Sequence, residues 1–509
     1  MSDRSYLKKD AAMKTRVIRI LVSCIGAALL FAGCADFSLE ENEAAANKDL
    51  SANQDTVQEN TQENTQENTQ ESTTIESGEE IETENVETNE VLTEEGDVLH
   101  IVCWDEEFKS RMSDHYPEYE TIDDSHGKIG DTTILWTILS SDDSTYEEEL
   151  DLLLPDNETK DGENKVDLFL IESENAAKYA DADSDFALSL SDLGIEEEEL
   201  SSMFPFTLEA VTDENGEIKG ASWQAWAGGL IYRRDIAIEV LGSDDPDDVQ
   251  DYVKDWDSFQ ETASLMTQYG YQMIASMYDT YRVYSSNRKT SWVDESGAIQ
   301  IDDTVKTWAE NSLELLEEEA SGTSDLWSTE WMQGLYESGN VFCYFGPLWF
   351  INYSLASNEE GSVAGNGGWG LVEGPESFCW GGSWICAAKG SDNLTLDAEI
   401  IRTMCLDDEI LMEMAVEDFD CVNSKEVLSS LSSDESYNCD ILGGQNPYEI
   451  FPASAEAIHL DTLTCYDEVC DEEFSYAMRN YFDQTSTYEE AVEDFYDSVM
   501  TQYPELTKE

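Results

Sequence analysis

The sequence predicts an α/β fold of two domains behind an N-terminal export signal and an acidic tether. Strand-like apolar runs alternate with amphipathic helical segments through residues 98–509, and this alternation predicts crossover units and a largely parallel sheet. Residues 98–509 also hold all 13 tryptophans and are long enough for two domains. The residues before 98 lack the apolar content of a folded core.

The N-terminus has the pattern of a bacterial export signal. A basic start is followed by an apolar run at 20–31 and by small residues before Cys34. The run is too short for a stable membrane span and ends at a cleavage-like site. The ending FAGC resembles a lipobox, which implies that residues 1–33 are removed and that Cys34 is lipidated. Secretion with a free Cys34 is the alternative, and the signal can start at Met1 or Met13.

Residues 34–97 are predicted to be the lipidated cysteine and a disordered acidic linker. The segment 35–97 contains 20 acidic residues, one lysine, no tryptophan and no tyrosine, and it repeats TQEN at 61–72. Such a segment cannot bury enough apolar surface to fold. It therefore acts as a tether that holds the folded part away from a membrane.

The charge of the chain excludes one class of partner. The formal net charge is −87. Binding to nucleic acid depends on lysine and arginine contacts to phosphate, so nucleic acid is not expected as a partner. The same charge disfavours anionic ligands, unless the binding cleft is locally basic.

The cysteine and histidine content gives no indication of a metal site. Once Cys24 leaves with the signal and Cys34 is acylated, nine cysteines remain at irregular spacing, without a CxxC pair, and the chain has four histidines. An odd count at irregular spacing is not a disulfide framework. We expect no metal and no cofactor, and we expect most thiols to be small buried hydrophobic groups.

Two predicted strands of the first domain end at candidate ligand-binding residues. Residues 98–104 read as a strand that ends at Trp104 and Asp105, and residues 166–171 read as a buried strand that ends at Glu172. Ligands of parallel sheets lie beyond the carboxyl ends of the strands. These three side chains are therefore placed where a ligand would bind.

The rest of the chain continues the alternation. Further strands are expected at 134–139, 229–232 and 274–277, and residues 339–349 read as a strand that leads into a turn and the start of a helix. Helices are expected at 145–154, 234–242, 257–270, 304–319, 398–416, 453–463, 471–482 and 488–503. Residues 365–390 look like two short strands joined by a turn. Their three tryptophans, Trp369, Trp380 and Trp384, stand among eight glycines. That run is either a glycine-rich turn with core tryptophans or the wall of a binding cleft.

Together these features resemble the extracellular solute-binding lipoproteins of carbohydrate ABC transporters, family 1 type, which are similar to maltose-binding protein. The features are the lipobox, the polar tether, a strand ending CWD, GGLIYRRDI followed by a DW helix start, YFGPLWF, and the pair WG and WGGSW. The resemblance covers the whole mature chain in order. It implies a two-lobed periplasmic-binding-protein-like fold of class II, in which hinge strands join the lobes and a sugar is trapped between them. Lobe 1 would comprise 98–225 plus 381–440, and lobe 2 would comprise 226–380 plus 441–509.

A sugar site needs flat apolar surfaces and strong hydrogen-bonding groups. A pyranose has an apolar face of CH groups, on which an indole can stack, and a rim of hydroxyls, which carboxylates, amides and arginine can bind. Trp349, after Gly346 and Pro347, resembles the stacking position of the family. The candidate ligand-binding residues are Trp349, Trp104, Asp105, Asp279, Arg282, Trp369, Trp380, Trp384, Glu172, Trp226 and Gln224. For each tryptophan, the alternative to ligand binding is a position in the hydrophobic core. For Asp279 and Arg282, the alternative is that they pair with each other.

The predicted function is the capture of a sugar or short oligosaccharide and its delivery to an ABC permease. The protein would be a monomer, without catalytic residues, held by its N-terminal lipid on the extracellular face of the cell membrane of a Gram-positive bacterium. One alternative is a sensor lipoprotein that presents its ligand to a membrane receptor. Another is an extracellular glycoside hydrolase, which would need two carboxylates flanking a sugar bond; acids are so abundant here that the sequence offers no support for such a pair.

Overall fold

The computed structural model describes residues 95–508 except 140–144, 183, 356–359 and 435. The predicted signal segment, Cys34 and nearly all of the acidic linker lie outside the described residues. Within the described part of the chain, no helix combines the length and apolar character needed to cross a membrane.

A six-stranded mixed sheet forms the framework of lobe 1, in the order β10-β5-β1-β4-β3-β2. Its strands are β1 (Val98–Cys103), β2 (Tyr119–Thr121), β3 (His126–Ile129), β4 (Thr132–Ile138), β5 (Leu168–Glu172) and β10 (Ser383–Ala387). β1 runs parallel to β4 and β5, and β10 pairs antiparallel with β5. The strands β2, β3 and β4 form an antiparallel meander. The parallel core was predicted from the alternation of strand-like and helical segments, and the continuous apolar runs of β1 and β5 are typical of strands buried on both faces.

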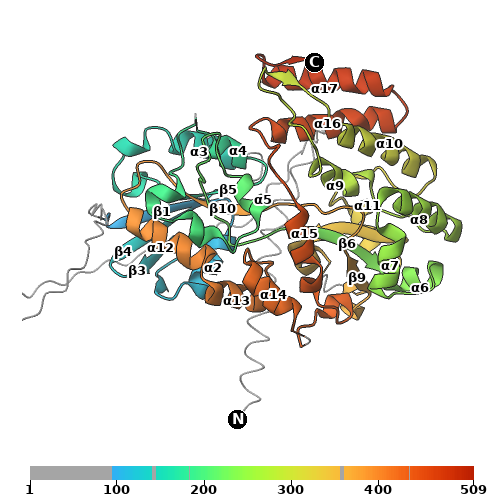
Figure 1. Ribbon diagram of the computed structural model, residues 1–509, viewed down its shortest axis with the longest axis horizontal. Helices are drawn as coiled ribbons and strands as arrows, with labels where there is room; N and C mark the ends of the chain where they lie inside the picture. Colours follow the sequence, from blue (N-terminus) through green and yellow to red (C-terminus); the bar gives the residue numbers. More distant parts are fainter. Residues whose placement is uncertain (1–94, 140–144, 183, 356–359, 435, 509) are drawn as a thin grey trace, which may run out of the picture. The chain divides into compact units, whose positions relative to one another are not determined.

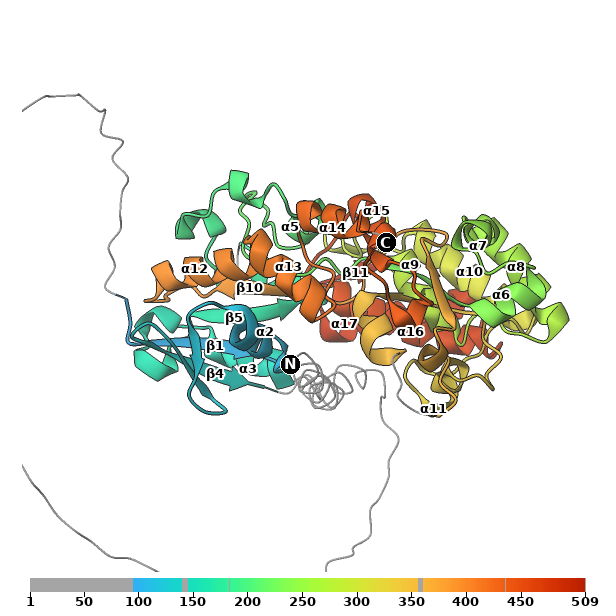
Figure 2. The ribbon, with the colours of Figure 1, turned by 90° about the horizontal axis from the view of Figure 1, so that it is seen from below.

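Helices cover this sheet and complete its core. Figures 1 and 2 show α12 and α13 lying along the sheet. The helices of this part are α2 (Glu107–His115), α3 (Thr145–Leu153), α4 (Ala176–Ala180), α5 (Pro205–Glu209), α12 (Leu394–Cys405), α13 (Asp408–Glu417) and α14 (Lys425–Ser432). The predicted single helix over 398–416 is divided into α12 and α13, because the Asp407 side chain accepts hydrogen bonds from the backbone N–H groups of Glu409 and Ile410 and so starts a new helix.

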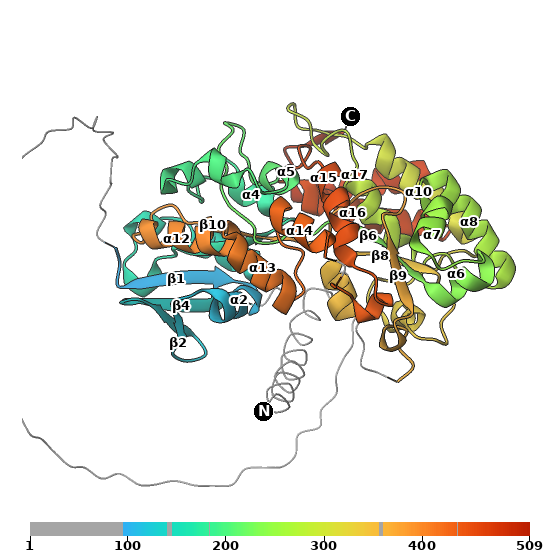
Figure 3. The same cartoon turned by 60° about the horizontal axis from the view of Figure 1, so that its bottom comes forward.

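A three-stranded sheet forms the framework of lobe 2, in the order β8-β6-β9. Its strands are β6 (Gly228–Arg233), β8 (Cys343–Pro347) and β9 (Trp369–Val372). Both pairings are antiparallel, so the expectation of a largely parallel sheet is wrong for this lobe. Figure 3 shows α6, α7 and α8 beside these strands. Their bounds are α6 (Arg234–Val240), α7 (Pro246–Val253) and α8 (Trp256–Tyr269).

The C-terminal helices pack on one another beside the second sheet. Buried aromatic residues, among them Trp292, Trp308, Phe474 and Phe495, form a hydrophobic cluster between α10, α16 and α17. The remaining elements are α9 (Tyr281–Ser285), α10 (Asp303–Glu317), α11 (Thr329–Met332), α15 (Phe451–Ala457), α16 (Asp467–Phe482), α17 (Tyr488–Gln502) and the short strands β7 (Ala298–Ile299) and β11 (Thr507–Lys508).

Short helical turns connect these elements. The 3₁₀ turns are η2 (Asn157–Thr159), η3 (Gly162–Asn164), η4 (Leu190–Leu193), η5 (Glu197–Leu200), η6 (Met277–Thr280), η7 (Gln333–Leu335), η9 (Ala364–Asn366), η10 (Asp440–Leu442) and η11 (Pro447–Glu449), and η8 (Phe350–Ser354) is a π-helical turn.

The predicted strand at 274–277 is wrong. These residues are buried, as their apolar character indicated, but their backbone does not join a sheet. The N–H of Met273 donates to the carbonyl of Ala320 at 2.7 Å, and the chain enters η6 at Met277. The apolar run belongs to a buried loop, whose backbone N–H groups donate hydrogen bonds to carbonyl groups of another loop.

The glycine- and tryptophan-rich run links the two sheets. β9 belongs to the three-stranded sheet and β10 to the six-stranded sheet, so the residues between them cross from one framework to the other. Gly381 and Gly382 have φ values of +80° and +118°, which side chains rarely adopt. A Cβ on Gly382 would lie 2.3 Å from the Trp226 ring. The glycines therefore permit both the crossing and the close approach of an indole.

All nine cysteines from Cys103 to Cys470 are free thiols, and all but Cys465 are buried. The prediction that most of them are small buried hydrophobic groups is confirmed.

Candidate functional site

The carboxyl ends of β1 and β5 bring three predicted residues to one edge of the first sheet. The two strands are parallel neighbours, with Val102 opposite Phe169. Trp104 and Asp105 follow β1, Glu172 ends β5, and all three side chains are partly exposed. The Trp104 ring meets the ring of Tyr146 edge to face at 5.5 Å. The parallel pairing thus produces the juxtaposition expected from the sequence.

The two acids at this edge have raised pKa values. Burial raises the pKa of Glu172 to about 8, with a further contribution from Glu174, and the charge of Arg282 opposes the shift. Burial also raises the pKa of Asp105. These side chains are accessible to solvent but poorly hydrated, which is the setting in which hydrogen bonds to a ligand are strengthened.

Three tryptophans of lobe 2 form a partly exposed aromatic cluster: Trp327, Trp349 and Trp380. Trp349 follows β8, and its Nε1 donates to the carbonyl of Trp380 at 3.1 Å. The ring centroids are 5.2 Å apart for Trp349 and Trp380, 6.4 Å for Trp327 and Trp349, and 5.9 Å for Trp327 and Trp380. The hydrogen bond and ring contacts fix the indoles while part of their surface stays accessible.

Trp327 is a member of this cluster that sequence reasoning missed. It lies in the loop before α11 and has a φ of 65°, a strained backbone conformation for a bulky side chain. Strain of this kind concentrates at functional sites. The only signal in the sequence was an isolated tryptophan among polar loop residues, in DLWSTE.

Arg282 connects the aromatic cluster to lobe 1. Its guanidinium lies 5.5 Å from the centroid of the Trp380 ring, and it forms an ion pair with Glu174, which follows β5. Arginine stacks on an indole through its flat face and keeps its donors available at the edge. The predicted role of Arg282 at the site therefore has geometric support, whereas the alternative pairing with Asp279 does not.

Asp279 has structural partners for both of its oxygens. Oδ2 accepts from the backbone N–H of Ser276 at 2.8 Å, and Oδ1 accepts from Nε1 of Trp331 at 2.7 Å. Burial raises the pKa of Asp279 to about 7, although these hydrogen bonds favour the charged form. Asp279 therefore caps η6 and orients Trp331 behind the aromatic cluster.

Three of the predicted tryptophans are core residues. Trp369 and Trp384 have no exposed surface and Trp226 is 2% exposed. Trp226 and Trp384 meet edge to face at 4.6 Å, and Trp384 Nε1 donates to the carbonyl of Thr207 at 2.7 Å. Because these rings present almost no surface to a ligand, the expectation that they contact one is corrected in favour of the alternative, a core position.

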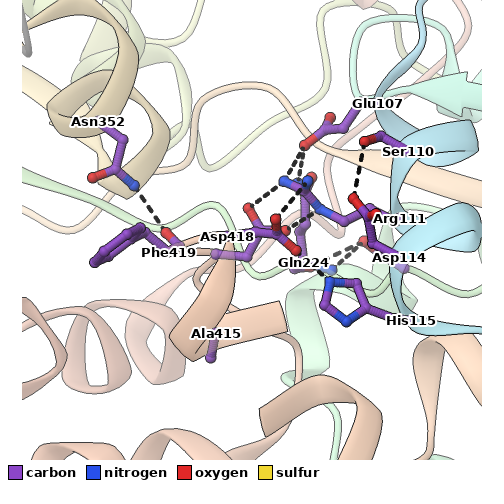
Figure 4. Close-up of polar contacts among 12 residues, drawn as sticks. Glu107, Ser110, Arg111, Asp114, His115, Gln224, Asn352, Ala415, Asp418 and Phe419 are labelled. Carbon is purple, nitrogen blue, oxygen red and sulfur yellow. Dashed lines mark hydrogen bonds and ion pairs between the residues drawn. The ribbon is translucent and has the colours of Figure 1, made fainter. Parts of the chain in front are cut away.

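A buried charge network lies next to Gln224 (Figure 4). The amide of Gln224 donates to Glu107 Oε1 at 2.9 Å. Glu107 also accepts from Arg111 at 3.2 Å, and Arg111 pairs with Asp420 at 2.8 Å. Arg111 is 2% exposed, and burial raises the pKa of Glu107 to about 8. Gln224 thus orients a carboxyl group at the start of α2, a helix that the sequence reading did not predict.

The turn after β8 joins this network to lobe 2. Asn352 Nδ2 donates to the carbonyl of Phe419 at 2.9 Å, and Figure 4 shows the two residues facing each other. Burial raises the pKa of Tyr353, in the same turn, and the charge of Arg111 opposes this shift. These residues belong to η8, and π-helical turns are frequent at functional sites. Trp349 therefore stands on a segment fixed by contacts to both lobes.

Taken together, the site offers accessible indole surface, carboxyl groups, one amide and one arginine. Among the described residues, no group of His, Cys, Asp and Glu is arranged to hold a metal ion. The arrangement suits a ligand with an apolar face and a hydroxyl rim, because indoles pack on the face and the polar groups hydrogen-bond the rim.

The chain is similar to known proteins in fold but not closely similar to them in sequence. No family model and no curated protein matches the chain. A crystal structure of an extracellular solute-binding protein of family 1 matches with a TM-score of 0.64 and 15% identity, over 79% of this chain and 99% of that one. This chain has the two-lobed fold of the extracellular solute-binding proteins.

Two other structures with the solute-binding-protein fold contain a bound disaccharide. An ABC transporter-associated binding protein from B. animalis subsp. lactis, in complex with β-1,6-galactobiose, matches with a TM-score of 0.58 and 17% identity, over 81% of this chain and 100% of that one. The galacto-N-biose/lacto-N-biose I-binding protein from Bifidobacterium longum, in complex with lacto-N-biose, matches with a TM-score of 0.58 and 12% identity, over 81% and 97%. Both are binding proteins by their descriptions.

Proposed function

We propose that this protein captures a sugar or short oligosaccharide at the cell surface and delivers it to an ABC permease. The observation that carries the proposal is the partly exposed cluster of Trp327, Trp349 and Trp380, with Arg282 stacked on one ring and paired across to Glu174 of lobe 1. A ligand on the indoles would contact groups from both lobes. The bound disaccharides of the two similar structures support the same ligand class.

The charges at the site favour a neutral or cationic sugar. Asp105, Glu172 and Glu174 are acidic, and the base that faces them, Arg282, is already paired. A carboxylate or sulfate on the ligand would enter a setting that already disfavours the charged forms of Asp105 and Glu172, and the base that the described residues bring there, Arg282, is paired with Glu174. The ligand is therefore proposed to be an uncharged or amino sugar and not a sugar acid.

A thermal-shift screen tests the ligand class. The protein is mixed with neutral mono- and disaccharides, amino sugars and sugar acids over a range of concentrations. A ligand that binds only the folded state adds about 2.7 kcal/mol at a concentration of 100 times Kd, so a specific sugar raises the melting temperature progressively. If no carbohydrate shifts the transition while an unrelated solute does, the proposal is wrong.

Delivery to a permease is tested separately from binding. The sugar found in the screen is added, with this protein, to vesicles that contain the candidate permease complex. We expect ATP hydrolysis to rise only when the sugar and the protein are both present. Unchanged hydrolysis with a permease that imports this sugar through another binding protein would contradict the transport role and leave sugar capture intact.

The proposed lipid anchor at Cys34 has a matched control within the signal segment. Cys34→Ser should release the protein from the membrane fraction and abolish incorporation of labelled fatty acid. Cys24→Ser should leave both unchanged, since Cys24 lies in the apolar run that is removed. Retention of labelled fatty acid by Cys34→Ser would contradict the assignment.

A further inference from the structure

Phe419 has a backbone conformation that its side chain disfavours. It is the second residue after α13, and its φ is 61°, in the left-handed region where bulky side chains are outliers. A helix that ends in this conformation commonly has glycine there. Backbone strain persists only where the surrounding structure imposes it, so the contacts of the adjacent residues must hold Phe419 in place.

One guanidinium holds the residues on both sides of Phe419. Arg111, on α2, donates from Nε to Asp420 Oδ2 at 2.8 Å and from Nη2 to Asp420 Oδ1 at 3.1 Å. Its Nη1 lies 3.5 Å from Asp418 Oδ1. Because the guanidinium is planar and its donors form a rigid fork, it fixes the two carboxylates relative to each other. Arg111 and Asp420 are both buried, which makes this pair costly to break.

Two further contacts fix the same segment. Nε2 of His115, also on α2, lies 2.5 Å from Asp418 Oδ2. The hydroxyl of Tyr448, in η11, lies 2.9 Å from the carbonyl oxygen of Asp420 and 3.0 Å from that of Ala415. Tyr448 and His115 are both buried. The end of α13 is therefore held from two other elements, on both sides of the strained residue.

The carbonyl of Phe419 contacts the turn that carries Trp349. It accepts from Nδ2 of Asn352 at 2.9 Å, and Figure 4 shows the two residues facing each other. Asn352 lies three residues after Trp349, in η8. Phe350, in the same turn, packs on Trp380 with ring centroids 6.1 Å apart. A shift of η8 would therefore move Trp349 and disturb the ring contacts beside it.

This contact joins the two lobes through protein atoms alone. Phe419 follows α13, which covers the first sheet, whereas Asn352 follows β8 of the second sheet. The donor is a side-chain amide and the acceptor is a backbone carbonyl, so the contact forms without a ligand. Its geometry depends on the direction of the Phe419 carbonyl, which the strained backbone sets.

We propose that Arg111 is a positioning residue, which holds the strained Phe419 carbonyl as the acceptor on which η8 docks and so fixes Trp349 before a ligand binds. A binding surface that is fixed in advance loses less conformational entropy on binding. The consequence for sugar affinity rests on the proposed function, whereas the contact itself is tested without a ligand. Failure of sugar capture and failure of the positioning contact can therefore be told apart.

Hydrogen exchange of the full chain without ligand tests the contact. Asn352→Ala removes the donor to Phe419 and adds no charge. We expect protection of the peptide that covers η8 to fall about three- to tenfold, because a partly buried carbonyl loses its donor, while peptides of β1 and α8 exchange as in the parent. Equal protection of η8 in Asn352→Ala and the parent would overturn the proposal.

Asn438→Ala is the matched control for this experiment. Nδ2 of Asn438 also donates to a backbone carbonyl, that of Ser436 at 2.9 Å, but within one exposed loop. The variant should therefore leave the protection of η8 at the parent value. A loss in η8 equal to that of Asn352→Ala would show that the effect is not specific to the Phe419 contact and would overturn the proposal.

A double-variant cycle tests whether Arg111 acts through Phe419. Arg111→Lys keeps a charge beside Asp420 but lacks the rigid fork, so it should also lower the protection of η8. If Arg111 acts through the contact of Phe419 with Asn352, the double variant with Asn352→Ala loses no more protection than the larger of the two single losses. A general structural role would lower the protection of β1 as well. Additive losses in η8 would overturn the assignment of Arg111.

Asp418→Asn covers the case in which Arg111→Lys does not fold. It keeps the size of the side chain and leaves the pair of Arg111 with Asp420 in place, but it weakens the hold on the residue before Phe419. Protection of η8 should fall, again without adding to the loss from Asn352→Ala. Unchanged protection of η8, or additive losses, would contradict the positioning role.

Calorimetric titration with the sugar from the screen measures the consequence for binding. Asn352→Ala should raise the Kd about three- to tenfold, and Asn438→Ala should leave it at the parent value. Unchanged affinity of Asn352→Ala, with η8 less protected, would overturn the positioning of Trp349. If no sugar binds the parent, the proposed function is wrong, and the exchange experiments still decide whether Arg111 holds η8.

Discussion

Arg282 of lobe 2 forms an ion pair with Glu174 of lobe 1 while its guanidinium lies over the ring of Trp380. The side chain thus connects an acidic edge of the first sheet with the aromatic cluster that follows the second. Arg282 has two kinds of partner, a charged carboxylate and a flat ring, and variants can separate what each partner contributes to sugar affinity.

Arg282→Lys should weaken sugar binding more than Glu174→Gln. Lysine keeps the positive charge but lacks the flat guanidinium that stacks on Trp380 and the fork of donors that binds hydroxyls. Glu174→Gln removes a partly exposed ion pair, which is worth no more than about 1 kcal/mol. Calorimetric titration with the sugar from the screen measures both affinities. Equal affinities for Arg282→Lys and the parent would show that the guanidinium does not bind the ligand.

Trp349→Ala should raise the Kd for the sugar by at least about tenfold, because a central aromatic contact at a binding site is commonly worth 2 kcal/mol or more. The variant should remain folded, since part of the ring is already exposed. Titration gives the affinity, and circular dichroism gives the fold. Unchanged affinity would remove Trp349 from the site.

Trp384→Phe provides the matched control and tests the corrected assignment of the core tryptophans. The ring is fully buried and its Nε1 donates to the carbonyl of Thr207. Its replacement therefore leaves a small cavity and a buried carbonyl that has lost its donor. We expect a loss of about 1–3 kcal/mol in the free energy of unfolding with sugar affinity unchanged. Weaker binding at full stability would return Trp384 to the ligand site.

The sequence could predict the elements whose signals are local. β1 and β5 are continuous apolar runs, and α8 ends at Gly270 in a left-handed conformation, as expected. The fate of each tryptophan was not predictable in the same way, because Trp384 and Trp380 stand in the same glycine-rich run and differ only in which neighbours cover them. Arg111 was missed for a related reason, since its partner Asp420 is 309 residues away in the chain.

Sugar acids should bind much more weakly than the matching neutral sugars. A carboxylate on the ligand would add a negative charge near Asp105 and Glu172, and the ion pair of Arg282 with Glu174 would have to break to neutralise it. We expect the acid form to lose at least about tenfold in affinity relative to its neutral counterpart, equivalent to about 1.4 kcal/mol. A competition titration at low and high salt measures the difference. Equal affinity of the two forms would contradict the proposed charge preference.

Glu172→Gln should flatten the pH dependence of stability. The pKa of Glu172 is about 8 in the folded protein, above the ordinary value for glutamate, so the folded state retains a proton that the unfolded state releases. The free energy of unfolding therefore falls as the pH rises from about 4.5 to about 8. Glutamine does not titrate, so the variant loses this contribution to the pH dependence, which is at most about 3.5 kcal/mol between pH 5 and 8. Urea denaturation at several pH values measures it, with Glu163→Gln as the control, because Glu163 is exposed in η3. If the free energy of unfolding depends on pH in the same way for the two variants, Glu172 is ordinarily hydrated. The edge of the sheet beside Trp104 would then not strengthen hydrogen bonds to a ligand.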